Sequence, residues 1–177
     1  ANSITGNSGA NILTGYAGHD ILNGGSGEDD LRGGDGDDRY IIDNVNDTIT
    51  EGDSKGTDTA WSTASTFTLS DNVENLLLRG SSDIDGVGND LANTIRGNSG
   101  ANELTGNAGN DTLKGYGGDD ILEGGDGNDI LDGGSGEDDL RGGDDNDRYI
   151  IDNVNDTITE ESSKGTDIAW STASTFT

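Results

Sequence analysis

A nine-residue period runs through residues 106–150 and constrains the fold of this chain more than any other feature. The five consecutive units read GNAGNDTLK, GYGGDDILE, GGDGNDILD, GGSGEDDLR and GGDDNDRYI. Their shared pattern is G-G-x-G-x-D-x-U-x, in which U is Leu or, in the last unit, Tyr. Copies in register at one fixed period indicate a repeat architecture, in which each unit packs mainly on its neighbours.

Each unit divides into a predicted turn and a predicted strand. Glycine adopts positive φ angles without the steric cost that a Cβ brings, so G-G-x-G-x-D predicts a six-residue turn. The remaining x-U-x predicts a short strand that points U to one side and its two neighbours to the other. The interior positions predicted in this way are Ile4, Leu13, Leu22, Leu31, Tyr40, Leu113, Leu122, Leu131, Leu140 and Tyr149.

Four earlier units begin at Gly6 and read GNSGANILT, GYAGHDILN, GGSGEDDLR and GGDGDDRYI. The sixth position of a unit holds Asp or, in the opening units, Asn. Glycines let backbone carbonyls crowd inward beside the Asp carboxylate, and these oxygens are the ligands that Ca²⁺ prefers. The Asp-bearing turns are therefore predicted Ca²⁺ sites. Asn offers an oxygen without charge, so the Asn-bearing turns are expected to bind weakly or not at all.

These units resemble the RTX, or hemolysin-type, calcium-binding nonapeptide repeats. The resemblance implies an all-β fold, a right-handed parallel β-roll or β-solenoid that binds several Ca²⁺ ions. It implies that two units make one coil, so that alternate turns stack on one edge with Ca²⁺ between them. The stacked sets are then Asp111 with Asp129 and Asp147, Asn102 with Asp120 and Asp138, Asn11 with Asp29, and Asp20 with Asp38.

The ligand set that the resemblance carries onto this chain contains sixth-position side chains and the first and fourth glycines of the units. The side chains are those of Asn11, Asp20, Asp29, Asp38, Asn102, Asp111, Asp120, Asp129, Asp138 and Asp147. The glycines are Gly15, Gly18, Gly24, Gly27, Gly33, Gly36, Gly106, Gly109, Gly115, Gly118, Gly124, Gly127, Gly133 and Gly136.

The repeats form two tandem blocks, and a segment without the nine-residue period joins them. We divide the chain into a first block at 1–43, a connecting segment at 44–87, a second block at 88–152 and a partial copy of the connecting segment at 153–177. Residues 59–69 and 72–79 of the connecting segment read as strands. We favour irregular β coils that continue the solenoid, and the alternative is a small β cap packed by Trp61 and Phe67.

A tandem duplication relates the two halves and supports the coil length. Residues 24–68 and 133–177 differ at five of 45 positions, and the second copy carries 18 additional residues in its repeats. Eighteen residues are two units, so the insertion preserves both the inward pattern and the edge on which each turn lies. The chain starts within a unit, at Ala1, and stops at Thr177, the counterpart of Thr68. We expect a piece of a longer array, with end coils that are exposed or paired with a neighbouring chain.

The charge of the chain bears on its partners and its location. Asp and Glu number 36 against 9 Lys and Arg, the formal net charge is −27, and 28% of the residues are hydrophobic. Such a chain is disordered unless cations neutralise it. The acidity argues against nucleic-acid and anionic-membrane partners, and no apolar run is long enough for a membrane span. The family resemblance and the absence of Cys favour a secreted or extracellular bacterial protein exported by type I secretion machinery. Association with the cell surface is an alternative.

No nucleophile–base–acid set is present, so we predict a module that is not an enzyme. The favoured function is a calcium-binding structural module that folds on Ca²⁺ binding after secretion. The alternatives are an adhesin or polysaccharide-binding module, or a non-catalytic accessory region of a secreted enzyme. Trp61 and Trp170 are expected in the core rather than on a sugar-stacking surface, and His19 is expected at the surface. The carboxylates of Asp43, Asp47 and Glu51, repeated 109 residues later, are an additional candidate cation site.

Overall fold

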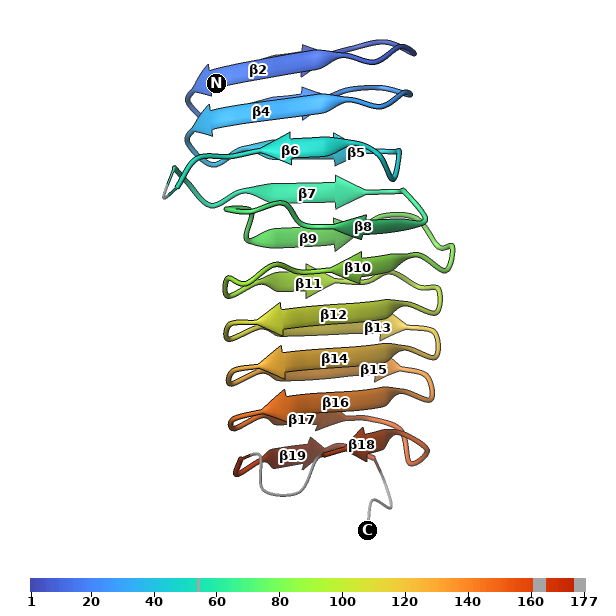
Figure 1. Cartoon of the computed structure of the whole chain (residues 1–177). Helices are drawn as coiled ribbons and strands as arrows, with labels where there is room; N and C mark the ends of the chain where they lie inside the picture. The colour runs from blue at the N-terminus through green and yellow to red at the C-terminus, as the bar shows by residue number, and fades with distance from the viewer. Residues whose placement is uncertain (54, 161–164, 174–177) are drawn as a thin grey trace.

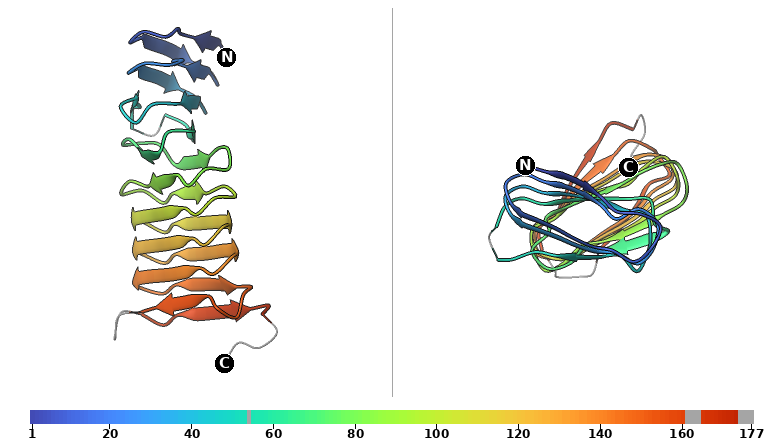
Figure 2. Two further views of the ribbon diagram at one scale, coloured as in Figure 1. Left: turned by 90° about the vertical axis from the view of Figure 1, so that its right-hand side faces the viewer. Right: turned by 90° about the horizontal axis from the view of Figure 1, so that it is seen from above.

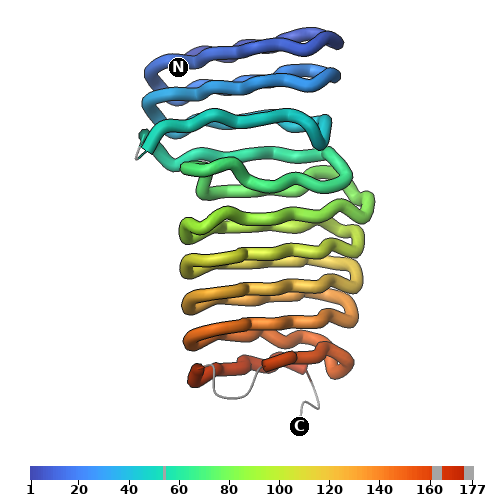
Figure 3. Tube along the Cα trace, viewed as in Figure 1, coloured from blue at the N-terminus to red at the C-terminus, as the bar shows by residue number. Residues whose placement is uncertain are grey.

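The chain forms one elongated stack of coils. A computed structural model describes residues 1–53, 55–160 and 165–173, and the coils follow one another from the N-terminus to the C-terminus along a single axis (Figures 1 and 3). The structure is all-β, and every strand pair is parallel. Among the described residues there is no helix of the length and apolarity needed to cross a membrane.

One face of the stack is a continuous sheet of ten strands. In spatial order they are β1 (Ser3–Thr5), β3 (Ile21–Asn23), β5 (Arg39–Ile42), β7 (Thr59–Ser62), β9 (Asn75–Leu78), β11 (Thr94–Arg96), β13 (Thr112–Gly117), β15 (Ile130–Ser135), β17 (Arg148–Ile151) and β19 (Ile168–Ser171). This sheet crosses both repeat blocks and the segment between them. The connecting segment therefore continues the solenoid, and the alternative of a separate cap is excluded.

The opposite face is interrupted. Its first sheet has three strands, β2 (Ile12–Ala17), β4 (Asp30–Asp35) and β6 (Thr48–Thr50). Its second sheet has six, β8 (Thr66–Thr68), β10 (Asp85–Val87), β12 (Glu103–Ala108), β14 (Ile121–Asp126), β16 (Asp139–Asp144) and β18 (Thr157–Thr159). The break between β6 and β8 lies in the connecting segment, where the coils are irregular.

The pairing register confirms the eighteen-residue coil. In the second block Leu113 lies beside Leu131, and Leu122 lies beside Leu140. At the end of each block the next coil is longer, because Arg39 pairs with Thr59 and Arg148 with Ile168. In Figure 1 the nearer strands β12, β14 and β16 run left and the farther β13 and β15 run right as the chain descends, so the coil is right-handed, the hand usual for parallel crossovers.

A single column of apolar side chains fills the space between the two faces. Predicted interior residues such as Leu22, Leu131 and Tyr40 are fully buried, because strand alternation points every U position inward. Leu13 is only partly buried. Viewed along the axis, the flattened coils are rotated relative to one another between the N-terminal and C-terminal ends (Figure 2), as the right-handed twist of strands requires.

Three sequence expectations need correction. Six-residue strands occur at β2, β4 and β12 to β16, because the first three residues of the next unit, as in Ile121–Asp126, continue the strand. Residues 59–69 are two strands on opposite faces, so Ala60 and Phe67 point inward while Trp61 points outward. Trp170 is 56% exposed, which contradicts core packing. The predicted segment 153–177 is described only to residue 160 and over 165–173.

Candidate metal centre

The sixth-position aspartates form two ladders along the edges of the stack. One Asp129 carboxylate oxygen, Oδ1, accepts a hydrogen bond from the backbone N–H of Asp111 at 2.7 Å, and Asp147 Oδ1 accepts from Asp129 at 2.8 Å. On the other edge Asp138 Oδ1 accepts from Asp120 at 2.9 Å. The predicted pairs Asn11–Asp29 and Asp20–Asp38 are joined in the same way. The structure therefore confirms the predicted stacking of alternate turns.

The second carboxylate oxygen of these aspartates has no partner. In the part of the chain that the structure describes, eight Oδ2 atoms are buried without a hydrogen bond, and all eight belong to predicted sixth-position aspartates. They are those of Asp20, Asp29, Asp38, Asp111, Asp120, Asp129, Asp138 and Asp147. Each of these residues is at most 2% exposed. An unpaired buried carboxylate is costly unless a cation or a proton neutralises it.

The first glycine of each unit makes room for this oxygen. A Cβ on Gly15 would lie 2.5 Å from Asp20 Oδ2 and 2.8 Å from the Gly33 carbonyl oxygen of the next coil. Gly106, Gly115 and Gly124 have the same two neighbours, an Asp carboxylate and a glycine carbonyl. Carboxylate and carbonyl oxygens of adjacent coils thus converge on one small space. A hard cation takes such a set of ligands.

The fourth glycine has a different role. Gly18, Gly27, Gly36, Gly109, Gly118, Gly127 and Gly136 all have positive φ, between 107° and 151°. The first-position glycines do not, so the reason for glycine there is close approach rather than backbone angle. Asp145 takes the fourth position of its unit at φ 75°, which an L-residue adopts at a cost.

Burial changes the acidity of the ladder. Removal from water raises the pKa of Asp129 and Asp138 to about 7, and that of Asp111 and Asp120 to about 6. Hydrogen bonds from the backbone oppose this increase, and neighbouring carboxylates of the ladder add to it at Asp129 and Asp138. Without an ion, these turns therefore bury carboxylates whose charged form is poorly solvated near neutral pH. A bound divalent cation would offset this desolvation cost.

The Asn-bearing turns are closed by their own hydrogen bonds. Asn102 Oδ1 accepts from the Asn98 N–H at 2.8 Å, and Asn102 Nδ2 donates to the Ile84 carbonyl at 2.7 Å. Asn98 Oδ1 in turn accepts from the Gly100 N–H. Asn11 likewise accepts from the Asn7 N–H at 2.7 Å. Protein groups bond both ends of the Asn102 amide and the oxygen of the Asn11 amide, which supports the expectation that such turns bind Ca²⁺ weakly.

Sequence reasoning missed the extension of both ladders beyond the repeats. Asp58 Oδ1 accepts from the Asp38 N–H at 2.7 Å, and Glu74 Oε2 accepts from the Asp58 N–H at 2.7 Å. Asp47 and Asp156 continue the other edge. The 18-residue spacing could have identified Asp47 and Asp156, because each lies 18 residues after a ladder aspartate. The same spacing could not identify Asp58, because its coil has two additional residues.

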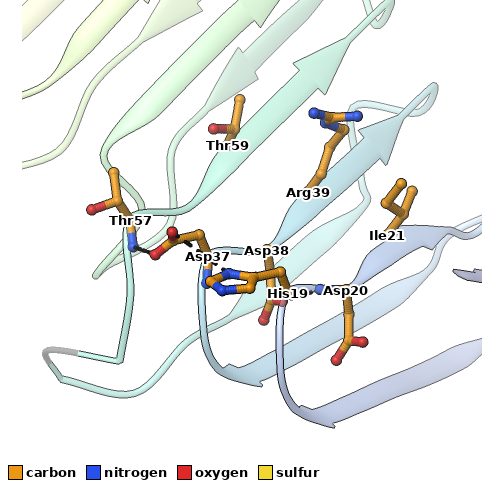
Figure 4. A pocket seen from close by; sticks show the side chains of 8 residues that line it. All are labelled: His19, Asp20, Ile21, Asp37, Asp38, Arg39, Thr57 and Thr59. Carbon is orange, nitrogen blue, oxygen red and sulfur yellow. Dashed lines mark hydrogen bonds and ion pairs between the residues drawn. The ribbon is translucent and has the colours of Figure 1, made fainter. Parts of the chain in front are cut away.

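Outside the two aspartate ladders, the fifth-position residues form a further row of hydrogen bonds along one edge. His19 Nδ1 accepts from the Asp37 N–H at 2.8 Å, and Asp37 Oδ1 accepts from the Thr57 N–H at 2.9 Å. These residues line a groove of about 280 Å³ and follow one another along three coils (Figure 4). Asn128, Asn146 and Thr166 line the equivalent groove of the second copy. His19 is exposed, as predicted, and its ring also orders the turn.

The comparisons agree with the geometry of the turns. A model of one protein family, described as RTX calcium-binding nonapeptide repeat, matches the chain in four copies at residues 5–40, 15–49, 87–122 and 114–149. Together these stretches cover more than half of the chain and contain every Asp with an unpartnered Oδ2. No curated protein matches the chain.

Proposed function

The chain belongs to the RTX calcium-binding nonapeptide repeat family, and on this premise we propose that it is a structural module that folds when Ca²⁺ binds. One observation carries the proposal: the eight buried carboxylate oxygens without a partner are those of the sixth-position aspartates. The carboxylates of these residues, with carbonyl oxygens of the turn glycines, would hold the ions. The bound Ca²⁺ supplies charge neutralisation and cross-links between coils.

The charge of the chain explains why folding would depend on the ion. A net charge of −27 opposes the compact state through repulsion. Stacking adds to this repulsion because it brings Asp111, Asp129 and Asp147 close together on one edge. Ca²⁺ binds only where the turns are stacked, so its binding free energy becomes folding free energy. The proposed divisions follow, with ion-binding blocks at 1–43 and 88–152 and ion-poor segments at 44–87 and 153–177.

RTX repeats are typical of secreted bacterial proteins, and we place this chain outside the cell. Extracellular calcium modules work at about 10⁻⁴–10⁻³ M Ca²⁺, whereas the cytosolic concentration is far lower. The chain would remain unfolded before export, which suits passage through type I secretion machinery, and fold afterwards. Its role is then to fold and present a larger protein, without catalysis of its own.

Circular dichroism in chelator and then in Ca²⁺ tests this function. We expect weak β signal in chelator and a cooperative gain as Ca²⁺ is added. Mg²⁺ is the matched control, because it prefers smaller octahedral sites and gives up its water reluctantly. The same β spectrum in chelator and in Ca²⁺ would overturn the proposal.

A second candidate, polysaccharide binding, gains support from the position of the tryptophans. Trp61 points outward, with the guanidinium carbons of Arg39 and Arg79 at 4.1 and 4.6 Å from its ring centroid. Arg148 lies over Trp170 at 4.7 Å. Arg guanidinium groups beside an aromatic ring favour acidic sugars over neutral ones. A glycan array in Ca²⁺ tests this, and Arg79→Ala should abolish any binding to polyuronates; no binding to acidic polymers would exclude it.

A further inference from the structure

A cluster of oxygen atoms that differs from the repeat turns closes each block. Oxygens of Asp38, Glu51 and Asp58 all lie within 4.8 Å of one another. The sequence pattern had placed Glu51 with Asp43 and Asp47, but Asp47 instead accepts hydrogen bonds from its own turn, at the Asp43 and Asn44 N–H groups. Glu51 instead follows β6 in the 18-residue register, opposite Gly33, so it lies beside the last repeat turn, on the edge of Asp38.

Glu51 stands where the register would place the first glycine of a further unit, and it adds a carboxylate there. In a regular pair of turns the space beside the first glycine is shared by the sixth-position carboxylate and a glycine carbonyl of the next coil, as at Gly15. Beside Gly33 the neighbours are instead Asp38 Oδ2, Glu51 Oε1 and the Tyr40 hydroxyl. The Gly34 N–H also points to the Glu51 carboxylate, at 3.3 Å from Oε2. A second side-chain carboxylate thus comes as close to this space as the sixth-position carboxylate does, which is not the case beside Gly15.

The tyrosine supplies an independent observation. Tyr40 is fully buried, and its hydroxyl has no hydrogen-bond partner although carboxylate oxygens converge on the same point. A hydroxyl among carboxylates ordinarily donates to one of them. Oxygens that surround a common centre without bonding to each other have the arrangement of ligands around a cation.

The same arrangement occurs in the second copy. Oxygens of Asp147, Glu160 and Asp167 lie within 4.8 Å of one another. The Tyr149 hydroxyl is buried without a partner and lies beside Gly142 together with Asp147 Oδ2. Both copies also have the long coil at this point, with pairing offsets of 20 residues at Arg39–Thr59 and Arg148–Ile168.

We propose that each block ends in a further divalent-cation site, formed by Asp38, Glu51, Asp58 and Tyr40 in the first copy and by Asp147, Glu160, Asp167 and Tyr149 in the second. Three carboxylates exceed the charge of one divalent ion, so the site favours the hard, highly charged ions that take oxygen ligands. It fastens the long coil to the last repeat turn, where Glu51 and Glu160 stand in the register of a first-position glycine. The inference rests on the proposed function, because Asp38 and Asp147 are also ligands of the repeat turns, whereas Glu51 and Glu160 belong to the end sites alone.

Calorimetric titration of the full chain with Ca²⁺ tests this assignment. Glu51→Gln and Glu160→Gln should each remove one ion from the total, and the double variant should remove both. The matched control is Glu28→Gln with Glu137→Gln, a duplicated pair of exposed turn glutamates whose carboxylates accept from Asn46 and Asn155. This control should bind as many ions as the unaltered chain.

A second pair of variants covers the case in which the glutamine variants misfold. Tyr40→Phe and Tyr149→Phe keep the buried ring and remove only the oxygen, so the chain should fold in Ca²⁺ and bind the end ions more weakly by tenfold or more. Equal stoichiometry and affinity in the unaltered chain and in every variant would overturn the assignment. The absence of Ca²⁺ binding in the unaltered chain would instead contradict the proposed function.

Discussion

The turn that carries Asp111 and the turn that carries Asn102 differ in how their buried polar atoms are satisfied. They read GNAGND and GNSGAN, so both have Asn at the second position. Asp111 leaves Oδ2 buried without a partner, whereas the Asn102 amide bonds at both ends, to Asn98 and Ile84. Asn107 has φ 81°, while Asn98 accepts from the Gly100 N–H to form a local turn. Under the proposed function, the sixth residue therefore decides whether a turn needs an ion.

The two kinds of turn are distributed in blocks. Unsatisfied carboxylates fill 15–38 and 106–147, and self-satisfied turns stand at the start of each block. The turns at the Asp47 and Asp156 ends resemble the closed kind, because those carboxylates accept from their own turn residues. Coils with unpartnered buried carboxylate oxygens are thus bordered by coils whose turns are held by protein hydrogen bonds. Each prediction below changes one side of this comparison.

Asp129→Ala should have the largest effect. It removes an ion ligand and leaves the buried Asp111 N–H without its acceptor, which costs about 1–3 kcal/mol apart from ion binding. The Ca²⁺ concentration at the folding midpoint should rise at least about tenfold. Asn11→Ala, in an Asn-bearing turn, is the control and should change the midpoint little. Equal shifts in a Ca²⁺ titration followed by circular dichroism would refute the stacking account.

Gly127→Ala should have the second-largest effect, a loss of stability. Gly127 has φ 128°, and an added Cβ would overlap the Gly109 carbonyl of the preceding coil. The left-handed angle alone costs about 1–2 kcal/mol, and the overlap adds to it. Gly117→Ala is the matched control, since its Cβ would meet Ser135 alone, at 3.3 Å from Oγ and 3.7 Å from the carbonyl oxygen, and its φ is not positive. Comparable melting temperatures of the two variants in Ca²⁺ would contradict this role.

A reciprocal exchange tests the rule of the sixth residue. Asp111→Asn should close a turn that is now open, so the chain should fold at least as well without Ca²⁺ and bind less of it. Asn102→Asp should do the opposite and create a demand for Ca²⁺. Calorimetry in parallel with chelator melts measures both effects. If both variants bind Ca²⁺ and melt like the unaltered chain, the sixth residue does not determine whether a turn needs an ion.

Acid should partly replace the ion. The ion-free fold raises the pKa of Asp129 and Asp138 from 3.8 to about 7, so below that pH the folded state binds more protons than the unfolded state. Stability of the ion-free fold therefore increases as pH falls from about 8 to about 5, and is lost as pH rises through the folded pKa. Circular dichroism in metal-free buffer at both pH values measures this stability. A weaker β signal at the lower pH would contradict the predicted pH dependence.

Much of the fold could be predicted from the sequence, because a fixed period determines both the coil length and the inward face. Leu131 and Leu140 are buried for the reason that their spacing indicated. The ladder within the repeats followed from the same count. What could not be predicted depends on coils that depart from the period. Asp58 reaches the edge only because two residues are added, and Trp61 turns outward because residues 59–69 bend between faces.

Hydrogen exchange across the chain, in metal-free buffer and in Ca²⁺, tests the central claim most directly. The open turns of 106–150 should gain the greatest amide protection when Ca²⁺ is added, and the connecting residues 72–87 should gain less, because their apolar side chains, such as Leu76 and Leu78, are buried without ions. Equal protection of 106–150 in the two buffers would contradict the claim that unpartnered aspartate oxygens make this fold depend on calcium.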